Sequence, residues 1–217
     1  MNVWVVIPAR NEQKTIGSVV ASTKRLYKNV VVVDDGSTDK TKVIAAKNKA
    51  IVLSHAVNLG KGAALKTGCD YAVKNGAVVL VVMDADAQHN PQDISQFLEK
   101  MKNVDIVFGY RKLDQNMPFI FKVGNTFINH LTFLLYGIKL HDTQCGFRAF
   151  SSASYRKIRW HSPDYSMESE MISNAGRYKL RYVEVPIKTV YKDRYKGTTV
   201  MDGIKIAMNM VWWKLRR

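Results

Sequence analysis

The chain has 217 residues, and 47% of them are hydrophobic, which is enough for one large domain with a substantial core. It carries 33 Lys and Arg against 18 Asp and Glu, and the net charge of +15 favours an anionic partner (nucleic acid, an anionic membrane surface or a phosphorylated substrate) over a basic surface that only aids solubility. The two cysteines, Cys69 and Cys145, exclude a disulfide framework and a cysteine-rich zinc site, and both fit a reducing cytosol.

The first half of the chain alternates short apolar runs with helical patterns. Runs rich in Val and Ile predict strands over residues 3–7, 30–33, 51–53, 78–82 and 106–108. Helical periodicity predicts helices over residues 15–27, 42–48 and 61–74, and a further helix that opens at Pro91. This order predicts an α/β fold in which helices flank a mostly parallel central sheet.

The second half is less regular, and we expect it to elaborate the same single domain. Helices are predicted over residues 119–136, 167–178 and 200–217, and an extended segment over residues 180–189. The predicted organisation is therefore one domain over residues 1–199, followed by a C-terminal amphipathic helix over residues 200–217. The most apolar stretch is interrupted by Lys122 and Asn125, so no transmembrane helix is predicted, and the opening residues do not resemble a signal peptide.

The buried strand over residues 78–82 is followed by two carboxylates one residue apart, Asp84 and Asp86. A protein interior tolerates such charges only when they are paired, solvated or bound to a cation. This spacing suits one Mg²⁺ or Mn²⁺ ion that keeps open positions for phosphate oxygens, which implies a nucleotide diphosphate. The alternative is an ordinary turn with two solvated aspartates.

Two other strand exits carry candidate ligands. Asp34 and Asp35 end the second strand, and one of them, by preference Asp35, is expected to accept hydrogen bonds from a nucleobase or a ribose. Residues 58–62 place Lys61 between two glycines at a helix start, where backbone N–H groups favour phosphate. That segment lacks P-loop spacing, so helix capping and diphosphate contact both remain open. Ligands in parallel sheets bind at this carboxyl edge of the strands.

Taken in order, four motifs (residues 6–12, 34–39, 58–62 and 83–89) resemble those of family 2 glycosyltransferases of the GT-A fold. Three segments of the second half resemble the dolichyl-phosphate or polyprenyl-phosphate hexose synthases within that family. They are Gly109-Tyr110-Arg111, residues 142–150 and Glu184-Val185-Pro186-Ile187. The resemblance implies a transferase that moves a hexose from a nucleotide diphosphate sugar to a polyprenyl or dolichyl phosphate, with inversion at the sugar.

The resemblance also implies residue roles. The positions that would hold the nucleotide sugar are Pro8, Arg10, Glu12, Val33, Asp35, Lys61, Asp84, Ala85 and Arg194. The metal would be bound by Asp84, Asp86 and Gln88, and the catalytic residues would be Asp86 and Arg111. The acceptor phosphate would meet Lys122 and Thr126, which stand where the subgroup has Arg and Ser. The family often has Tyr at the position of Arg10 and Lys at that of Val200.

The chemistry of the acceptor bears on whether a base is needed. A phosphate monoester is already ionised near neutral pH, so it needs no general base to act as a nucleophile. For a hydroxyl acceptor, Asp142 is the candidate base. We expect His89 and His141 to be structural or supporting residues. Glu168 and Glu170 cannot share a helix face, and Glu170 is preferred as the one that faces the site.

The predicted C-terminal helix combines Met and Trp residues with a basic end over residues 214–217, which suits a helix lying on anionic lipid. Packing on the core or on a partner subunit is the alternative. We therefore expect a cytoplasmic enzyme, peripheral on the inner face of the cell membrane, that binds no nucleic acid and acts either by itself or with a membrane-protein partner.

Three other functions are weighed against the lipid-phosphate transferase. One is a family 2 transferase with a glycan hydroxyl acceptor, and the second is a nucleotidyltransferase that shares the α/β core and the metal site. The third is a nucleic-acid-binding module, which is disfavoured because no reading motif or basic-aromatic repeat is present.

Overall fold

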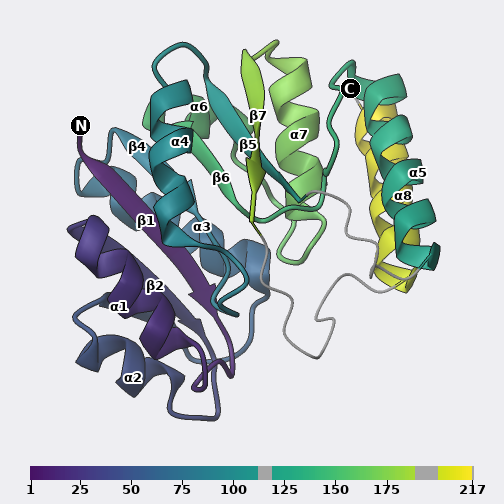
Figure 1. The fold of residues 1–217 in the computed structure, drawn as a ribbon. Helices are drawn as coiled ribbons and strands as arrows, with labels where there is room; N and C mark the ends of the chain where they lie inside the picture. Colours follow the sequence, from purple (N-terminus) through teal and green to yellow (C-terminus); the bar gives the residue numbers. More distant parts are fainter. Residues whose placement is uncertain (112–118, 189–199, 217) are drawn as a thin grey trace.

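The structure is a computed structural model that describes residues 1–111, 119–188 and 200–216. Its middle layer is a seven-stranded sheet in the order β3-β2-β1-β4-β6-β5-β7 (Figure 1). The strands are β1 (Val3–Ala9), β2 (Asn29–Asp35), β3 (Ile51–His55), β4 (Val79–Val82), β5 (Ile106–Arg111), β6 (Arg148–Ser151) and β7 (Tyr182–Ile187). Neighbours are parallel except at β6, which is antiparallel to both β4 and β5. The predicted mostly parallel α/β sheet is confirmed, but β6 was not predicted.

Helices cover both faces of the sheet. They are α1 (Ile16–Leu26), α2 (Thr41–Lys47), α3 (Lys61–Lys74), α4 (Ile94–Lys100), α5 (Phe119–Tyr136), α6 (Ser152–Ile158), α7 (Met167–Arg177) and α8 (Val200–Leu215). Apolar side chains of α1, α2 and α4 pack on one face, and those of α3, α6 and α7 pack on the other. Residues alternate between the faces along each strand, and both faces are covered, so the strands are apolar throughout.

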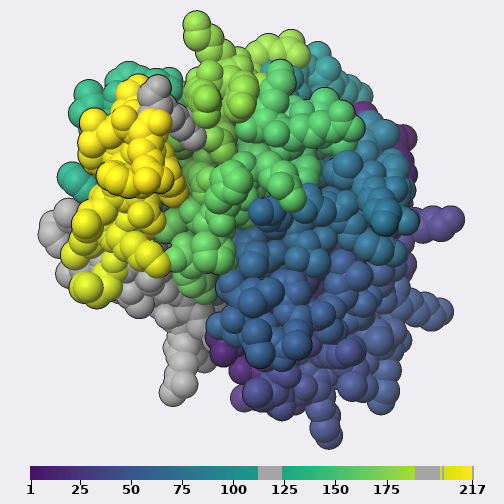
Figure 2. Space-filling view, turned by 180° about the vertical axis from the view of Figure 1, so that it is seen from behind, coloured from purple at the N-terminus to yellow at the C-terminus, as the bar shows by residue number. Residues whose placement is uncertain are grey.

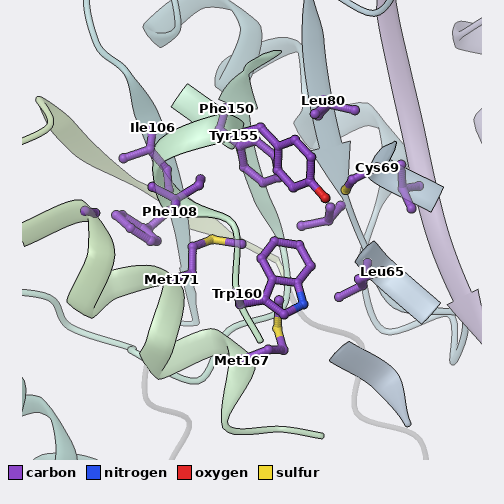
Figure 3. Close-up of a cluster of buried hydrophobic side chains, with 14 of the residues drawn as sticks. Leu65, Cys69, Leu80, Ile106, Phe108, Phe150, Tyr155, Trp160, Met167 and Met171 are labelled. Atoms are coloured by element: carbon purple, nitrogen blue, oxygen red, sulfur yellow. The ribbon is translucent and has the colours of Figure 1, made fainter. Parts of the chain in front are cut away.

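The core on the α3 face joins the two halves of the chain. Figure 3 shows Leu65 and Cys69 of α3 on one side of this core and Met167 and Met171 of α7 on the other. Trp160 lies between them, fully buried, and its indole N–H donates to the carbonyl oxygen of Gly62 at 2.8 Å. Because this donor is satisfied, the ring is buried without the cost of an unpaired polar atom.

Helices α5 and α8 form a pair at one side of the molecule (Figures 1 and 2). Ile128 of α5 packs against Ile206 and Met210 of α8 in a small core of their own. The pair also carries large exposed apolar side chains, namely Phe127, Phe133, Leu134, Met201, Ile204, Met208, Val211, Trp212 and Leu215. No helix in the described part of the chain combines the length and apolar content needed to cross a bilayer.

Candidate active site

The exits of β1 and β2 lie side by side, because the two strands are parallel neighbours. Pro8 is directly opposite Val33 in the register of the two strands. Beyond them, the backbone N–H of Asn11 donates to the Ser37 hydroxyl at 3.0 Å, and the Asn11 side chain accepts from the Thr38 N–H at 2.9 Å. Two predicted motifs, far apart in sequence, are thus tied together at the carboxyl edge of the sheet.

The remaining β1 and β2 positions differ in what they offer a ligand. Arg10 is exposed just beyond β1, whereas Glu12 is half-buried and accepts from the Thr15 hydroxyl at 2.9 Å beside the start of α1. Val33 is fully buried, and its side chain packs so closely under α3 that a Cβ on Gly68 would lie 2.9 Å from it. Neither the side chain nor the main chain of Val33 is therefore exposed at this edge of the sheet.

Asp35 shapes the loop that precedes α3. Its buried carboxylate accepts from the backbone N–H groups of Leu59 at 2.9 Å and Gly60 at 2.8 Å, and it lies 2.7 Å from His55 Nδ1. Its neighbour Asp34 is also buried, and Asp34 Oδ1 has no hydrogen-bond partner among the described residues. The carboxylate expected to act as a ligand is therefore engaged in this structure, and the unsatisfied oxygen belongs to Asp34.

The two glycines around Lys61 allow close contact between backbones. A Cβ on Gly60 would lie 2.4 Å from the carbonyl oxygen of Pro163, and one on Gly62 would lie 2.2 Å from that of Ser162. Gly60 also has a φ of 99°, which a residue with a side chain rarely adopts. Close packing against residues 162–163 thus requires glycine at both positions. The sequence patterns did not reveal this requirement.

Lys61 joins three elements of the site. Its ammonium lies 2.7 Å from Asp84 Oδ1, after β4, and 3.0 Å from Glu168 Oε1, on α7. Burial alone would lower the pKa of Lys61, but the two carboxylates outweigh burial and raise it. Burial would likewise raise the pKa of Asp84, and Lys61 instead lowers it to about 2. Both groups are therefore charged across the physiological range.

The segment after Asp84 turns back on itself. The backbone N–H of Gln88 donates to Asp86 Oδ1 at 3.0 Å, and Ala87 between them has a φ of 63°. Ala85 is buried and Gln88 half-buried. His89 Nδ1 accepts from the Asp84 N–H at 3.2 Å, and its ring stacks on Phe147 with centroids 4.9 Å apart. Burial lowers the pKa of His89 to about 4, so the ring is a neutral acceptor that supports the turn.

The residues around Asp84 fit a divalent metal that arrives together with a phosphate ligand. Burial and the charge of Asp84 raise the pKa of Asp86, a repulsion that a shared cation would relieve. Across residues 1–111, 119–188 and 200–216, no group of three or more His, Cys, Asp or Glu side chains could hold a metal by itself. Mg²⁺ is commonly bound by one or two carboxylates plus substrate phosphates, which matches this donor set.

Arg111 enters the site from the end of β5. Its guanidinium meets the Asp142 carboxylate with Nε at 2.6 Å and Nη2 at 3.0 Å, a two-pronged pair that fixes the guanidinium plane. Gly109 allows this placement, since its N–H donates to the Phe147 carbonyl oxygen at 2.8 Å and a Cβ on it would lie 2.8 Å from the same oxygen. Asp142 therefore orients Arg111.

A buried arginine holds the loop over residues 142–148 in place. Arg148 donates to the carbonyl oxygens of Cys145 at 3.0 Å, Thr143 at 2.7 Å and Glu168 at 2.8 Å. The loop then presents Gly146 to the carboxylate of Asp84, where a Cβ would lie 2.7 Å from Oδ2. The glycine at this point leaves room for the pair of Asp84 and Lys61.

Comparisons with known proteins agree with this geometry. The profile of "Glycosyl transferase family 2" matches residues 4–159. The chain belongs to glycosyltransferase family 2.

The chain is also similar to individual members of the family and to solved structures. The UDP-N-acetylglucosamine–dolichyl-phosphate N-acetylglucosaminyltransferase of Methanococcus voltae is 36% identical, over 98% of this chain and 96% of the relative. The undecaprenyl-phosphate mannosyltransferase of Micrococcus luteus is 30% identical, over 99% of this chain and 95% of the relative. Glucosyl-3-phosphoglycerate synthase of Mycobacterium tuberculosis, crystallised with Mg²⁺ and UDP, has a TM-score of 0.76 at 19% identity, covering 98% of this chain and 79% of its own. The predicted GT-A fold is thereby confirmed.

In this family 2 transferase, the glutamate that reaches the site is Glu168, and the expectation for Glu170 was wrong. The Glu170 carboxylate accepts from the N–H groups of His161 at 3.0 Å and Ser162 at 2.8 Å, so it anchors the segment that packs on Gly60 and Gly62. A sequence pattern shows that the two glutamates face different ways, but not which of them faces the lysine of another element.

The predicted acceptor residues lie on or near α5. Thr126 is exposed on this helix. Lys122 belongs to the same helix, but its side chain lies outside the described residues, as does the whole of Arg194. His141, expected to be a supporting residue, is exposed and lies 2.7 Å from Glu184 Oε2 on β7.

Proposed function

We propose that this family 2 transferase moves a hexose from a nucleotide diphosphate sugar to a polyprenyl or dolichyl phosphate, with inversion and with Mg²⁺ or Mn²⁺. The observation that carries the proposal is the cluster at the carboxyl edge of the sheet, where Asp84 and Asp86 lie beside Lys61. The charge of Arg111 also acts on Asp84, so carboxylates for a metal and cations for phosphates share one place. The two relatives named above, which carry dolichyl-phosphate and undecaprenyl-phosphate in their names, support a lipid phosphate as acceptor.

In this proposal the first half of the chain holds the donor. The base and ribose are received at the exits of β1 and β2, by Pro8, Arg10, Glu12, Val33 and Asp35. Asp84 and Ala85 lie beside the diphosphate. Asp84, Asp86 and Gln88 hold the metal, which when bound neutralises charge that develops on the leaving diphosphate. Lys61 and Arg194 add positive charge around the diphosphate, and Arg111 meets a phosphate of donor or acceptor.

The acceptor in this proposal needs no general base. A phosphate monoester is already ionised near neutral pH, and we propose that Lys122 and Thr126, both on α5, receive it. The environment of Asp142 supports a phosphate acceptor over a hydroxyl, because both carboxylate oxygens of Asp142 are engaged by Arg111. If the acceptor were a hydroxyl, this carboxylate would have to give up that pair before it could take a proton.

We further propose that the pair of α5 and α8 lies on the membrane surface at its cytoplasmic face, where a lipid phosphate is found. Met208 and Trp212 of α8 are exposed, the last turn of the helix carries Lys214, and Arg216 follows directly after the helix. An apolar face beside basic residues suits anionic lipid. Co-sedimentation with vesicles that contain phosphatidylglycerol should fall for Met208→Ser with Trp212→Ser and stay unchanged for Val43→Ser, an exposed valine on α2.

The decisive test is the transfer of labelled sugar to a short polyprenyl phosphate. UDP-N-acetylglucosamine, UDP-glucose and GDP-mannose would each be supplied with Mg²⁺, with Mn²⁺ and with EDTA. We expect one donor to label the lipid in a metal-dependent way. Asp86→Asn should lower that rate by about 100-fold or more, since it weakens charge stabilisation at the leaving group. Asp70→Asn, on the outer face of α3, is the matched control and should keep full activity.

Other outcomes would favour the alternatives. Metal-dependent donor binding without a lipid product would indicate a hydroxyl acceptor, and Asp142→Asn should then abolish transfer to a glycan. Release of pyrophosphate instead of a nucleoside diphosphate would identify a nucleotidyltransferase.

A further inference from the structure

The ammonium of Lys61 forms an ion pair with the carboxylate of Asp84, which is a proposed ligand of the metal. It lies 2.7 Å from Asp84 Oδ1, and the Lys61 side chain is 17% exposed. The second Asp84 oxygen faces Gly146, so closely that a Cβ there would lie 2.7 Å from it. Asp84 therefore lies between a cation and a backbone, with 26% of its side chain exposed, and a divalent ion that reaches it must compete with the lysine.

Glu168 offers the Lys61 ammonium a second carboxylate partner. Its side chain is 3% exposed, its Oε1 already lies 3.0 Å from Lys61 Nζ, and its Oε2 has no hydrogen-bond partner among the described residues. A buried unpaired carboxylate oxygen is costly unless a donor approaches it. The ammonium can thus move from Asp84 toward Glu168 without losing an ionic partner, which makes its release from Asp84 less costly than a full separation of charges.

We infer that Lys61 is a built-in counter-cation of the metal site. In the donor-free enzyme, Lys61 neutralises Asp84. When a diphosphate enters, the ammonium pairs with the diphosphate and with Glu168 instead. The Asp84 carboxylate is then available to a divalent cation. The inference rests on the proposed function for the identity of the site. This role would account for the placement of one lysine between two carboxylates at the site.

A lysine that neutralises Asp84 in the free enzyme also affects the order in which the metal and the diphosphate bind. The free enzyme binds the divalent ion weakly, because the ion must displace a cation that is already paired. The diphosphate and the metal then strengthen each other's binding, since each removes part of the cost of the other. Without the lysine charge, Asp84, Asp86 and Glu168 together attract the ion in the absence of any nucleotide.

The test is Mn²⁺ binding to the donor-free protein, measured by electron paramagnetic resonance of the unbound ion. We expect Lys61→Met to lower the Kd for Mn²⁺ by tenfold or more. Lys61→Arg keeps the charge and should leave the Kd near that of the wild type. Lys66→Met removes a charge from the same helix, where it acts on Asp70, and should also leave it unchanged. UDP and GDP should strengthen Mn²⁺ binding less in Lys61→Met than in the wild type.

The outcomes separate the two proposals. A Kd for Lys61→Met within twofold of the wild type, or weaker, overturns the role of the lysine while leaving the metal site intact. If the wild type binds no Mn²⁺ even with UDP or GDP, the metal-dependent function fails as well. Circular dichroism establishes that each variant is folded. If Lys61→Met does not fold, Lys61→Gln, whose neutral amide still donates to carboxylates, makes the same comparison.

Discussion

The two halves of this chain contribute to the site in different ways. In the first half, Asp35 is the last residue of β2 and Asp84 lies two residues beyond the end of β4, so parallel pairing brings them to one edge of the sheet. In the second half, Asp142 lies in a loop and Glu168 on a helix, and each reaches the site through a partner from another element. Strand order therefore positions the first set of residues, and buried long-range contacts position the second.

The contacts that hold these two sets of site residues in place also differ. Loops of the first half are tied by hydrogen bonds between adjacent strand exits, such as those of Asn11 to Ser37 and Thr38. The loop and helix of the second half depend on one buried cation, Arg148, and one buried anion, Glu170. Damage to the second set of supports should therefore cost more free energy than equal damage to the first.

The largest effect is expected from Arg148→Met. The variant leaves three buried carbonyl oxygens without their donor, so we expect the free energy of unfolding in urea to fall by about 3–5 kcal/mol. Arg159→Met removes a guanidinium from the half-exposed pair with Asp70, and should cost about 1 kcal/mol or less. Equal losses in the two variants would mean that Arg148 is not the main support of the second half.

A second effect is a dependence of stability on pH through His89. The folded-state pKa of about 4 lies below the unfolded value of roughly 6.5. As the pH falls between these values, the His89 imidazole becomes protonated in the unfolded chain but stays neutral in the folded protein. The contribution of the neutral ring to the free energy of unfolding is thus fully present above pH ~6.5, and it falls by about 3 kcal/mol as the pH drops toward ~4. Urea unfolding of His89→Gln over the same range should lack this component, and an unchanged slope would contradict it.

Contact between the halves is tested by Gly62→Ala. The new Cβ would meet the Ser162 carbonyl oxygen at 2.2 Å, so we expect a loss of about 1–3 kcal/mol in the free energy of unfolding. Gly124→Ala is the matched control, because nothing lies within 4 Å of a Cβ there on α5, and it should gain up to about 1 kcal/mol from helix propensity. If both glycines respond alike, close packing is not the reason for Gly62.

The smallest effect is expected at Ala87, whose φ of 63° is unfavourable for a residue with a Cβ. Ala87→Gly relieves that strain and should change the free energy of unfolding by less than about 1 kcal/mol, toward greater stability. Ala46→Gly, on the exposed side of α2, should instead lose about 0.5–1 kcal/mol. Thermal unfolding of the pair checks the prediction, and a loss at both positions would argue against strain in the turn.

The parts that sequence predicts well are those governed by local patterns. Runs of valine and isoleucine located the strands of the first half, and the motifs at their exits located Asp84 and its neighbours. The strand Arg148–Ser151 escaped prediction because it is short and begins with an arginine that is buried only by virtue of three carbonyl partners. The choice of Glu168 over Glu170 depends on where α3 lies, and helical periodicity carries no such information.

The position of β6 between β4 and β5 has a consequence for how the chain folds during synthesis. Strands β1 to β4 emerge in an order that lets them pair at once, whereas β5 emerges before β6 but belongs on its far side. Until residue 151 has been made, β5 has no place in the sheet, and β4 keeps an open edge. Folding should therefore proceed in two stages, and the interval between them is when a nascent chain is most exposed to pairing with the wrong strand.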